Sequence, residues 1–435
     1  MSTDDREQGF SRRKLLKGMA LAAGGVTLSG ALPGGLGSAA WAAAGDKLET
    51  RSAKLGFIAL TDAAPLFVAD EKGFFKKHGM TDVQVLKQSS WGTTRDNLVL
   101  GSRRGGIDGA HILTPMPYLM SAGAMSEKTP MRILARLNLA GQCISVGREY
   151  SDLNVGVDTT EFAKALAEKR AGGDEVRAAM TFPGGTHDLW IRYWMAAGGI
   201  NPDRDIATIT VPPAQMVANM RVGSMDTFCV CEPWNHQLVN QGIGYTANTT
   251  GELWHNHPEK AFGMRADYVD ANPNAARALV MAIMEAQMFC EQAENKEEVA
   301  RICSRRRWIH APYADIIDRM QGNFDYGTGR VVNDHPDQMR YWKDHASYPF
   351  QSHDLWFLTE NQRWGNLSLD LDTKSLIAQV NREDIWRDAA AKLGVDSADI
   401  PESTSRGPET FFDGKVFDPE NPKAYLDSLA ITRMG

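Results

Sequence analysis

Strand-like and helix-like segments alternate in two series along this chain, and this alternation restricts the fold more than any other feature of the sequence. The first series starts with an apolar, strand-like run at residues 54–60. A helix then opens with Pro65 in its first turn and ends in lysines followed by Gly79, and residues 82–85 form the next strand. Such a β-α-β unit builds a parallel sheet with helices on its faces.

A second series of the same kind begins after residue 150. Its strands and helices are predicted at 178–182, 186–197, 206–211, 214–222 and 226–230. Beyond residue 262 the chain becomes mainly helical. We therefore predict an α/β fold of two lobes around a cleft, which is where sheets of this kind bind their ligands.

The predicted lobes divide the chain at two places. Residues 43–150 form the first part of lobe 1, residues 151–260 form lobe 2, and residues 261–435 return to lobe 1. A chain of 435 residues is long enough for two such cores. The last hundred residues exceed what two minimal lobes need, and we interpret them as a helical C-terminal extension of lobe 1.

Residues 1–42 have the pattern of an export signal. Arg12 and Arg13 are followed by apolar residues, as in twin-arginine signals, and a Gly/Ala-rich run leads to an A-x-A cleavage site that ends at Ala42. The alternative is an uncleaved membrane anchor, but the glycines make this run a poor membrane span. We expect a periplasmic protein with a cleaved signal peptide.

Charge and cysteine content limit the partners of this chain. The formal net charge is −7, so no general positive field would attract nucleic acid, although a few local donors can still hold a small anion. Five cysteines are an odd number, so they cannot all pair within the chain. Cys229 and Cys231 have no second Cys/His pair at zinc spacing, and buried free thiols are the favoured interpretation.

The strongest physical candidate for a binding site is the glycine-rich turn that precedes the helix at 186–197. Gly185 lets the backbone approach a ligand closely, and the helix beginning at Thr186 directs unpaired N–H groups and a positive dipole end outward. His187 adds an imidazole donor in the same turn. The alternative is an ordinary capped helix start with a solvated histidine.

Three further polar or aromatic residues stand out from apolar or small surroundings. The amide of Gln142 would need a hydrogen-bond partner if buried, Lys260 could place a charge at the mouth of a cleft, and Trp91 could form a wall over a ligand. Each has an ordinary alternative, namely a core amide, an exposed lysine and a packed tryptophan.

These candidates converge in a family resemblance that covers nearly the whole chain after residue 42. Motifs of this sequence resemble the solute-binding proteins of nitrate and bicarbonate ABC importers; they lie at residues 54–66, 89–91, 111–117, 181–190, 212–216, 232–235 and 352–360. The resemblance implies a type II periplasmic-binding-protein fold whose lobes close on an anion held by Trp91, Gln142, His187 and Lys260. Gly185 and Thr186 are additional, weaker candidates. Cys231 departs from the small residue expected before Glu232.

The resemblance also implies the partners of the chain. We expect a monomer that delivers a small inorganic anion to an ABC permease in the inner membrane, without a cofactor; a bound calcium ion is conceivable but is not expected.

The chemistry of the anion separates nitrate from bicarbonate. Nitrate has no proton, so a pocket of N–H donors with one ammonium and no opposing acceptor suits it. Bicarbonate carries an O–H that needs an acceptor, and its receptors resemble a site with a carboxylate and a cation. Lys260 is the discriminating residue, although the neighbouring Glu259 makes the alignment sensitive to a shift of one residue. We favour nitrate and nitrite over bicarbonate and over sulfonates or other organic anions.

Two other classes of function compete with transport. An exported redox enzyme is disfavoured because the sequence has no paired C-x-x-C, G-x-S-x-G, Walker or H-E-x-x-H motif. A cytoplasmic nitrate sensor is disfavoured because such a protein should lack an export signal. We therefore expect that the chain is not an enzyme.

Overall fold

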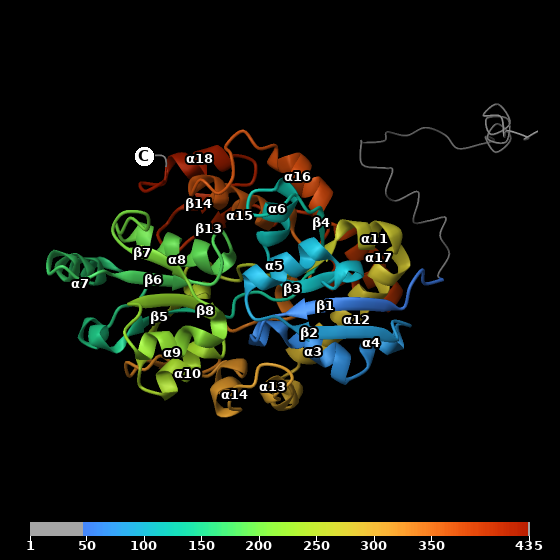
Figure 1. Ribbon diagram of the computed structural model, residues 1–435, viewed down its shortest axis with the longest axis horizontal. Helices are drawn as coiled ribbons and strands as arrows, with labels where there is room; N and C mark the ends of the chain where they lie inside the picture. Colours follow the sequence, from blue (N-terminus) through green and yellow to red (C-terminus); the bar gives the residue numbers. More distant parts are fainter. Residues whose placement is uncertain (1–46, 434–435) are drawn as a thin grey trace, which may run out of the picture. The chain divides into compact units, whose positions relative to one another are not determined.

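The computed structural model describes residues 47–433, so the signal predicted at 1–42 lies outside the described part of the chain. Five strands form sheet 1 in the order β2-β1-β3-β10-β4 (Figure 1). The pairs β1–β2 and β1–β3 are parallel, and β10 is antiparallel to both of its neighbours. The strands are β1 (Ser52–Phe57), β2 (Asp82–Lys87), β3 (Gly109–Leu113), β4 (Met131–Arg136) and β10 (Lys260–Arg265).

Sheet 2 repeats this arrangement in the order β7-β6-β8-β5-β9. Here β6 is parallel to β7 and β8, whereas β5 is antiparallel to β8 and β9. The strands are β5 (Gln142–Gly147), β6 (Arg177–Met180), β7 (Ala207–Thr210), β8 (Thr227–Cys231) and β9 (Gly244–Thr249). The prediction of two α/β lobes is therefore confirmed.

Two chain segments cross between the sheets, and each leads into an antiparallel strand. Residues 137–141 run from β4 into β5, and residues 250–259 run from β9 towards β10. The crossings pair with each other at Leu139 and Pro258. Since β5 pairs within sheet 2, that sheet begins at residue 142, earlier than the division after residue 150 that the sequence indicated.

The helices of the first series surround sheet 1. The single helix predicted after β1 is broken into α3 (Ala64–Glu71) and α4 (Phe74–Lys77), because Gly73 adopts a left-handed φ of 73° between them. The long α12 (Pro273–Glu291) packs against both. The apolar side chains of α3 are fully buried in this layer.

In the second series, α8 (Thr186–Ala197) begins and ends where the sequence pattern predicted. It is followed by α9 (Met216–Arg221) and α10 (Trp234–Asn240). Trp190 and Trp194 of α8 are both buried in the core of sheet 2.

The C-terminal segment does not extend lobe 1 alone. Trp356 of α15 (Gln351–Arg363) stacks on Trp190 of α8, with ring centroids 4.9 Å apart, and so joins the core of sheet 2. In contrast, α16 (Thr373–Val380) packs on α6 (Met116–Ala122) beside sheet 1. Figure 1 shows α15 beside α8, and α16 beside α6.

A third C-terminal helix, α17 (Glu383–Leu393), packs against α12 and β4. The C-terminal segment therefore contacts both lobes, because Trp356 packs in the core of sheet 2 while α16 and α17 lie on sheet 1.

The five cysteines are free and buried, which confirms the interpretation of Cys229 and Cys231 as buried free thiols; the sequence pattern made no prediction for the other three. Cys231, the residue that departs from the family pattern, is fully buried with its Sγ 3.7 Å from Thr61 Oγ1. Within residues 47–433, no helix combines the length and apolar character that a membrane span requires.

Candidate anion-binding site

The four residues singled out by the resemblance lie at the ends of four different elements. Trp91 is the first residue of α5 (Trp91–Leu100), and His187 is the second residue of α8. Gln142 is the first residue of β5 and Lys260 the first residue of β10, each directly after a crossing. All four side chains are completely buried.

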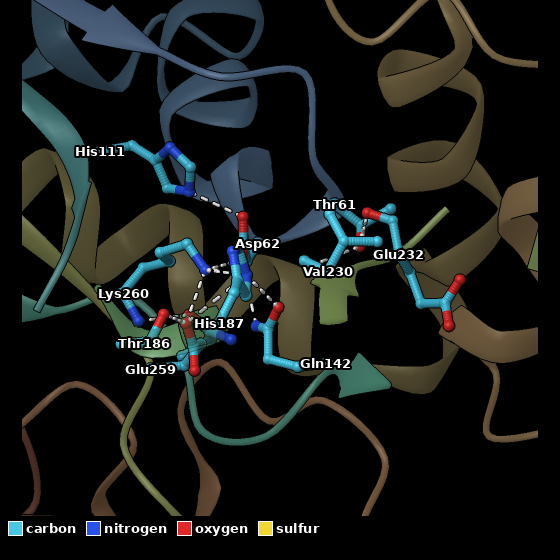
Figure 2. Close-up of polar contacts among 12 residues, drawn as sticks. Thr61, Asp62, His111, Gln142, Thr186, His187, Val230, Glu232, Glu259 and Lys260 are labelled. Carbon is cyan, nitrogen blue, oxygen red and sulfur yellow. Dashed lines mark hydrogen bonds and ion pairs between the residues drawn. The ribbon is translucent and has the colours of Figure 1, made fainter. Parts of the chain in front are cut away.

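These residues form one contact cluster. His187 Nε2 lies 2.8 Å from Gln142 Oε1 and 3.4 Å from Lys260 Nζ. The ammonium of Lys260 lies 5.9 Å from the centroid of the Trp91 ring. Figure 2 shows Lys260, His187 and Gln142 pointing toward one another. Residues 91 and 260 come from the elements of sheet 1, and residues 142 and 187 from those of sheet 2, so the cluster bridges the two lobes.

The imidazole of His187 is held in a neutral form. Its Nδ1 lies 2.5 Å from Thr181 Oγ1, opposite the contact with Gln142. Burial, and then the charge of Lys260, hold the pKa of His187 well below its ordinary value. A neutral imidazole still has one N–H, which in this ring can be carried by the nitrogen that faces Lys260 and Gln142.

Two carboxylates also contact Lys260, and this corrects the expectation of a pocket without an opposing acceptor. Lys260 Nζ lies 2.8 Å from Asp62 Oδ2 and 2.7 Å from Glu259 Oε1, and both acids are fully buried. A buried ammonium without a counter-charge would cost several kcal/mol, which explains why the fold supplies these partners. Burial favours the neutral amine, but the two carboxylates outweigh it and raise the pKa of Lys260.

Asp62 organises the donors of the cluster. It lies in a single helical turn, η1 (Thr61–Ala63), and also accepts hydrogen bonds from His111 Nε2 at 2.7 Å and Gln142 Nε2 at 3.3 Å. Burial would raise the pKa of Asp62, but Lys260 and His111 lower it below its ordinary value. The sequence signal was present, because Asp62 is a polar residue at the carboxyl end of a strand, where α/β sheets place their ligands.

The carboxylate of Glu259 is hydrogen-bonded by residues of lobe 2. Its carboxylate accepts hydrogen bonds from the hydroxyl of Thr186 and, at 2.8 Å, from Trp190 Nε1, both in α8. Burial raises the pKa of Glu259, although Lys260 opposes this shift. Thr186 therefore contacts the cluster through Glu259. Adjacent in sequence, Glu259 and Lys260 both belong to the site.

Trp91 and Gly185 differ from the other candidates in their contacts. The indole Nε1 of Trp91 is buried, and it has no hydrogen-bond partner among the described residues. A Cβ on Gly185 would lie 2.6 Å from Leu113 Cδ1 and 3.0 Å from Phe182 O, so glycine lets α8 approach sheet 1 closely. The amide of Gly185 itself donates to Phe182 O.

No group of three or more His, Cys, Asp or Glu residues within residues 47–433 has an arrangement that could hold a metal ion. The cluster contains N–H donors and one ammonium together with the two carboxylates that pair with the ammonium, and the indole N–H of Trp91 has no partner among the described residues.

Comparisons with known proteins define the class of protein to which this chain belongs. Residues 46–304 match the NMT1-like family. The nitrate/nitrite binding protein NrtA of Synechocystis is 62% identical over 386 residues, which cover 88% of this chain and 86% of that protein. The bicarbonate-binding protein CmpA of Synechococcus elongatus is 43% identical, covering 90% of this chain and 89% of that protein.

A solved structure agrees with this assignment. The crystal structure of the periplasmic nitrate-binding protein NrtA from Synechocystis superposes with a TM-score of 0.86 at 61% identity and covers 88% of this chain and all of that chain. The protein is a two-lobed solute-binding protein of the periplasmic type, not an enzyme, as the sequence predicted. It belongs to the NMT1-like family, in the group that includes NrtA and CmpA.

Proposed function

We propose that this protein binds nitrate or nitrite between its two lobes and delivers it to an ATP-driven importer. The observation that carries the proposal is the buried Nε1 of Trp91, which has no hydrogen-bond partner among the described residues and belongs to a ring whose centroid lies 5.9 Å from the ammonium of Lys260. A buried donor without a partner is costly unless a ligand accepts its hydrogen bond. The NrtA relatives, which are named for nitrate and nitrite, are also more similar to this chain than CmpA is.

In this mechanism the lobes hinge at the two crossings. Lys260 and Trp91 approach the anion from lobe 1, and Gln142 and His187 approach it from lobe 2. Because both crossings end directly at ligand residues, a rotation about residues 137–141 and 250–259 separates the two pairs. The anion stabilises the closed form only to the extent that it binds that form more tightly.

The entering anion competes with two internal carboxylates. In the structure Lys260 is already paired with Asp62 and Glu259, so an anion must share or replace one of these contacts. Exclusion of water strengthens each charged contact in the closed site. We infer that the two acids position the ammonium and also limit the affinity for the anion.

Bicarbonate is the second candidate, and one observation favours it. Its O–H would find an acceptor in Asp62 or Glu259, which removes the argument that the pocket lacks acceptors. Nitrate is still preferred because Lys260 is present and because of the NrtA similarity. Titration calorimetry with nitrate, nitrite and bicarbonate, with and without calcium, distinguishes the two. Bicarbonate binding tighter than nitrate binding would reverse the assignment.

The first test of the nitrate site is Lys260→Glu. Loss of the ammonium should weaken nitrate binding by about 2–5 kcal/mol, as for broken buried charge pairs. The control is Lys128→Gln at an exposed lysine, which should bind nitrate as the unchanged protein does. Equal calorimetric affinity of Lys260→Glu and the unchanged protein would rule out a role for this residue.

Trp91→Phe is a gentler test, because the indole N–H that it removes has no partner in the protein. We expect nitrate binding to weaken by roughly 1.5–3 kcal/mol, the range for a hydrogen bond to a charged group, with a folded protein retained. Calorimetry measures the affinity and circular dichroism checks the fold. Unchanged affinity would show that the indole nitrogen does not contact the anion.

We further propose that residues 1–42 are a cleaved twin-arginine signal and that the mature protein acts as a monomer on an inner-membrane permease. No calcium ion is expected in the site. For the lobes we propose boundaries at the crossings, with residues 142–249 forming lobe 2. Mass spectrometry of the periplasmic protein would test the cleavage after Ala42.

A further inference from the structure

A second polar groove lies outside the cluster around Lys260. It is built by the end of α12, the start of α13 (Lys296–Ser304) and residues 334–343, and its volume is about 860 Å³. Its walls include Lys296, Arg340, Lys343, Trp342, Met288 and Gln338. Volumes of several hundred Å³ are typical of sites for organic ligands and exceed what a nitrate ion fills.

Lys296 is the most unusual group in this groove. The residue is only 6% exposed, yet its ammonium donates no hydrogen bond to another residue of the described chain. It lies 5.2 Å from the centroid of the Tyr341 ring. Burial lowers the pKa of Lys296, and nearby Arg340 and Lys343 lower it further, against the opposing charge of Glu291. A buried lysine of this kind is energetically costly without an anion.

Arg340 contributes a second unsatisfied donor. Its Nε is buried without a hydrogen-bond partner within residues 47–433, and its NH1 is 4.0 Å from Glu291 Oε1. The backbone at this position is fixed, because Leu139 N donates to Arg340 O at 2.9 Å and Arg340 N donates to Leu139 O at 3.2 Å. The guanidinium therefore belongs to a segment whose backbone is hydrogen-bonded to the first crossing and is rigid there.

The acidic residues of the groove neutralise these cations only in part, since Glu291 Oε1 lies 4.0 Å from Arg340 NH1. Glu291 Oε2 accepts hydrogen bonds from the backbone amides of Tyr341 and Trp342 at 2.6 and 2.9 Å, so this oxygen of the carboxylate is engaged by backbone donors. Asp334 accepts from Gln338 Nε2 at 3.1 Å, and Glu294 is exposed. The inner end of the groove therefore holds two cationic side chains: Lys296, whose ammonium donates no hydrogen bond within residues 47–433, and Arg340, whose buried Nε has no partner there.

We propose that this groove binds a small organic carboxylate, whose oxygens accept hydrogen bonds from Lys296 and Arg340. Guanidinium and ammonium groups together match the geometry and charge of a carboxylate. Trp342 and Met288 offer apolar surface to a short carbon chain, and exposed Lys343 adds positive charge at the rim. The site is separate from the cluster around Lys260, because no residue that lines the groove belongs to that cluster.

Calorimetric titration with glutarate, in the presence of saturating nitrate, tests this proposal on the full mature protein. We expect one saturable site at millimolar or lower concentration. Lys296→Gln and Arg340→Gln should each weaken glutarate binding at least tenfold, by loss of a charged hydrogen bond, while Lys296→Gln keeps the nitrate affinity of the unchanged protein within twofold. Absence of saturable glutarate binding would overturn the proposal.

The matched control is Lys260→Gln, titrated with glutarate alone. This variant should bind glutarate as the unchanged protein does, whether or not nitrate is the ligand of the cluster around Lys260. Failure of the nitrate proposal can therefore be distinguished from failure of the carboxylate proposal. If Lys260→Gln loses glutarate binding while Lys296→Gln keeps it, glutarate binds in the cluster around Lys260, and the proposed site in the groove is overturned. Tighter binding of inorganic phosphate than of glutarate would overturn the carboxylate assignment.

A measurement on the unchanged protein removes any dependence on how the variants fold. Crystals soaked in glutarate should show the ligand between Lys296 and Arg340. Density only in the cluster around Lys260, or none at all, would contradict the proposal.

Discussion

A fully buried lysine with two buried acidic partners is an uncommon arrangement, and at Lys260 it explains much of the candidate site. The three charges come from η1, from the end of the second crossing and from the first position of β10. Asp62 also binds His111 and Gln142, so one carboxylate aligns donors from both lobes. Removal of a partner from such a buried network leaves an uncompensated charge.

Asp62→Asn should therefore lower the free energy of unfolding by about 3–5 kcal/mol, because Lys260 and His111 lose their negative partner. Urea-induced unfolding measures this change. The matched control is Asp267→Asn, whose carboxylate is 67% exposed in its pair with Arg265 and should cost less than about 1 kcal/mol. Equal effects of the two substitutions would show that the buried network contributes no special stability.

At the scale of elements, the close contact between α8 and sheet 1 positions His187. Gly185 precedes α8, and a Cβ at this position would lie 2.6 Å from Leu113 Cδ1 of β3 and 3.0 Å from Phe182 O. The imidazole is two residues further along, in the first turn of the helix. A small shift of this helix start would move His187 relative to Lys260.

Gly185→Ala should cost about 1–3 kcal/mol of stability, the usual range for overpacking, and should also weaken nitrate binding because α8 must move. Gly156→Ala is the control, since the nearest atom to its added Cβ is 3.9 Å away. It should change stability by less than about 0.5 kcal/mol. Thermal unfolding and calorimetry test both variants. Full nitrate affinity in Gly185→Ala would contradict the argument from close packing.

For the whole molecule, the C-terminal segment joins the two lobes through buried polar and aromatic groups. Arg136 of β4 forms a buried ion pair with Asp354 of α15, and Trp356 of the same helix enters the core of sheet 2. Burial lowers the pKa of His353, also in α15, from 6.5 to about 3. The unfolded chain binds a proton at this position below pH 6.5, whereas the folded chain does not until about pH 3.

Because the unfolded state binds more protons in this range, the stability contributed by neutral His353 is complete at neutral pH and is lost as the pH falls from 6.5 towards 3. The loss is up to about 1.4 kcal/mol per pH unit. His353→Phe should flatten the pH dependence of urea unfolding by up to this amount. His310→Asn, at an exposed histidine, is the control. Parallel pH profiles for His353→Phe and the unchanged protein would contradict this prediction.

Local patterns in the sequence predicted a large part of this molecule. The periodicity of residues 186–197 and the strand–helix alternation before it depend on neighbours in sequence, so α8 and most parallel strands of both sheets were recognised. Trp91, Gln142, His187 and Lys260 were chosen through a family resemblance, and their contacts in one buried cluster agree with that choice; their role as ligands stays a prediction.

Tertiary structure alone decided the pairing of distant groups. The assignment of β5 to sheet 2, the contact of α15 with α8, and the pairing of Asp62 with Lys260 all join residues far apart in the chain. Composition and spacing do not predict such pairings. The pairings depend on which buried surfaces and charges find partners when the chain packs. The sequence by itself determined the two α/β series and the family, and packing decided the electrostatic balance of the site.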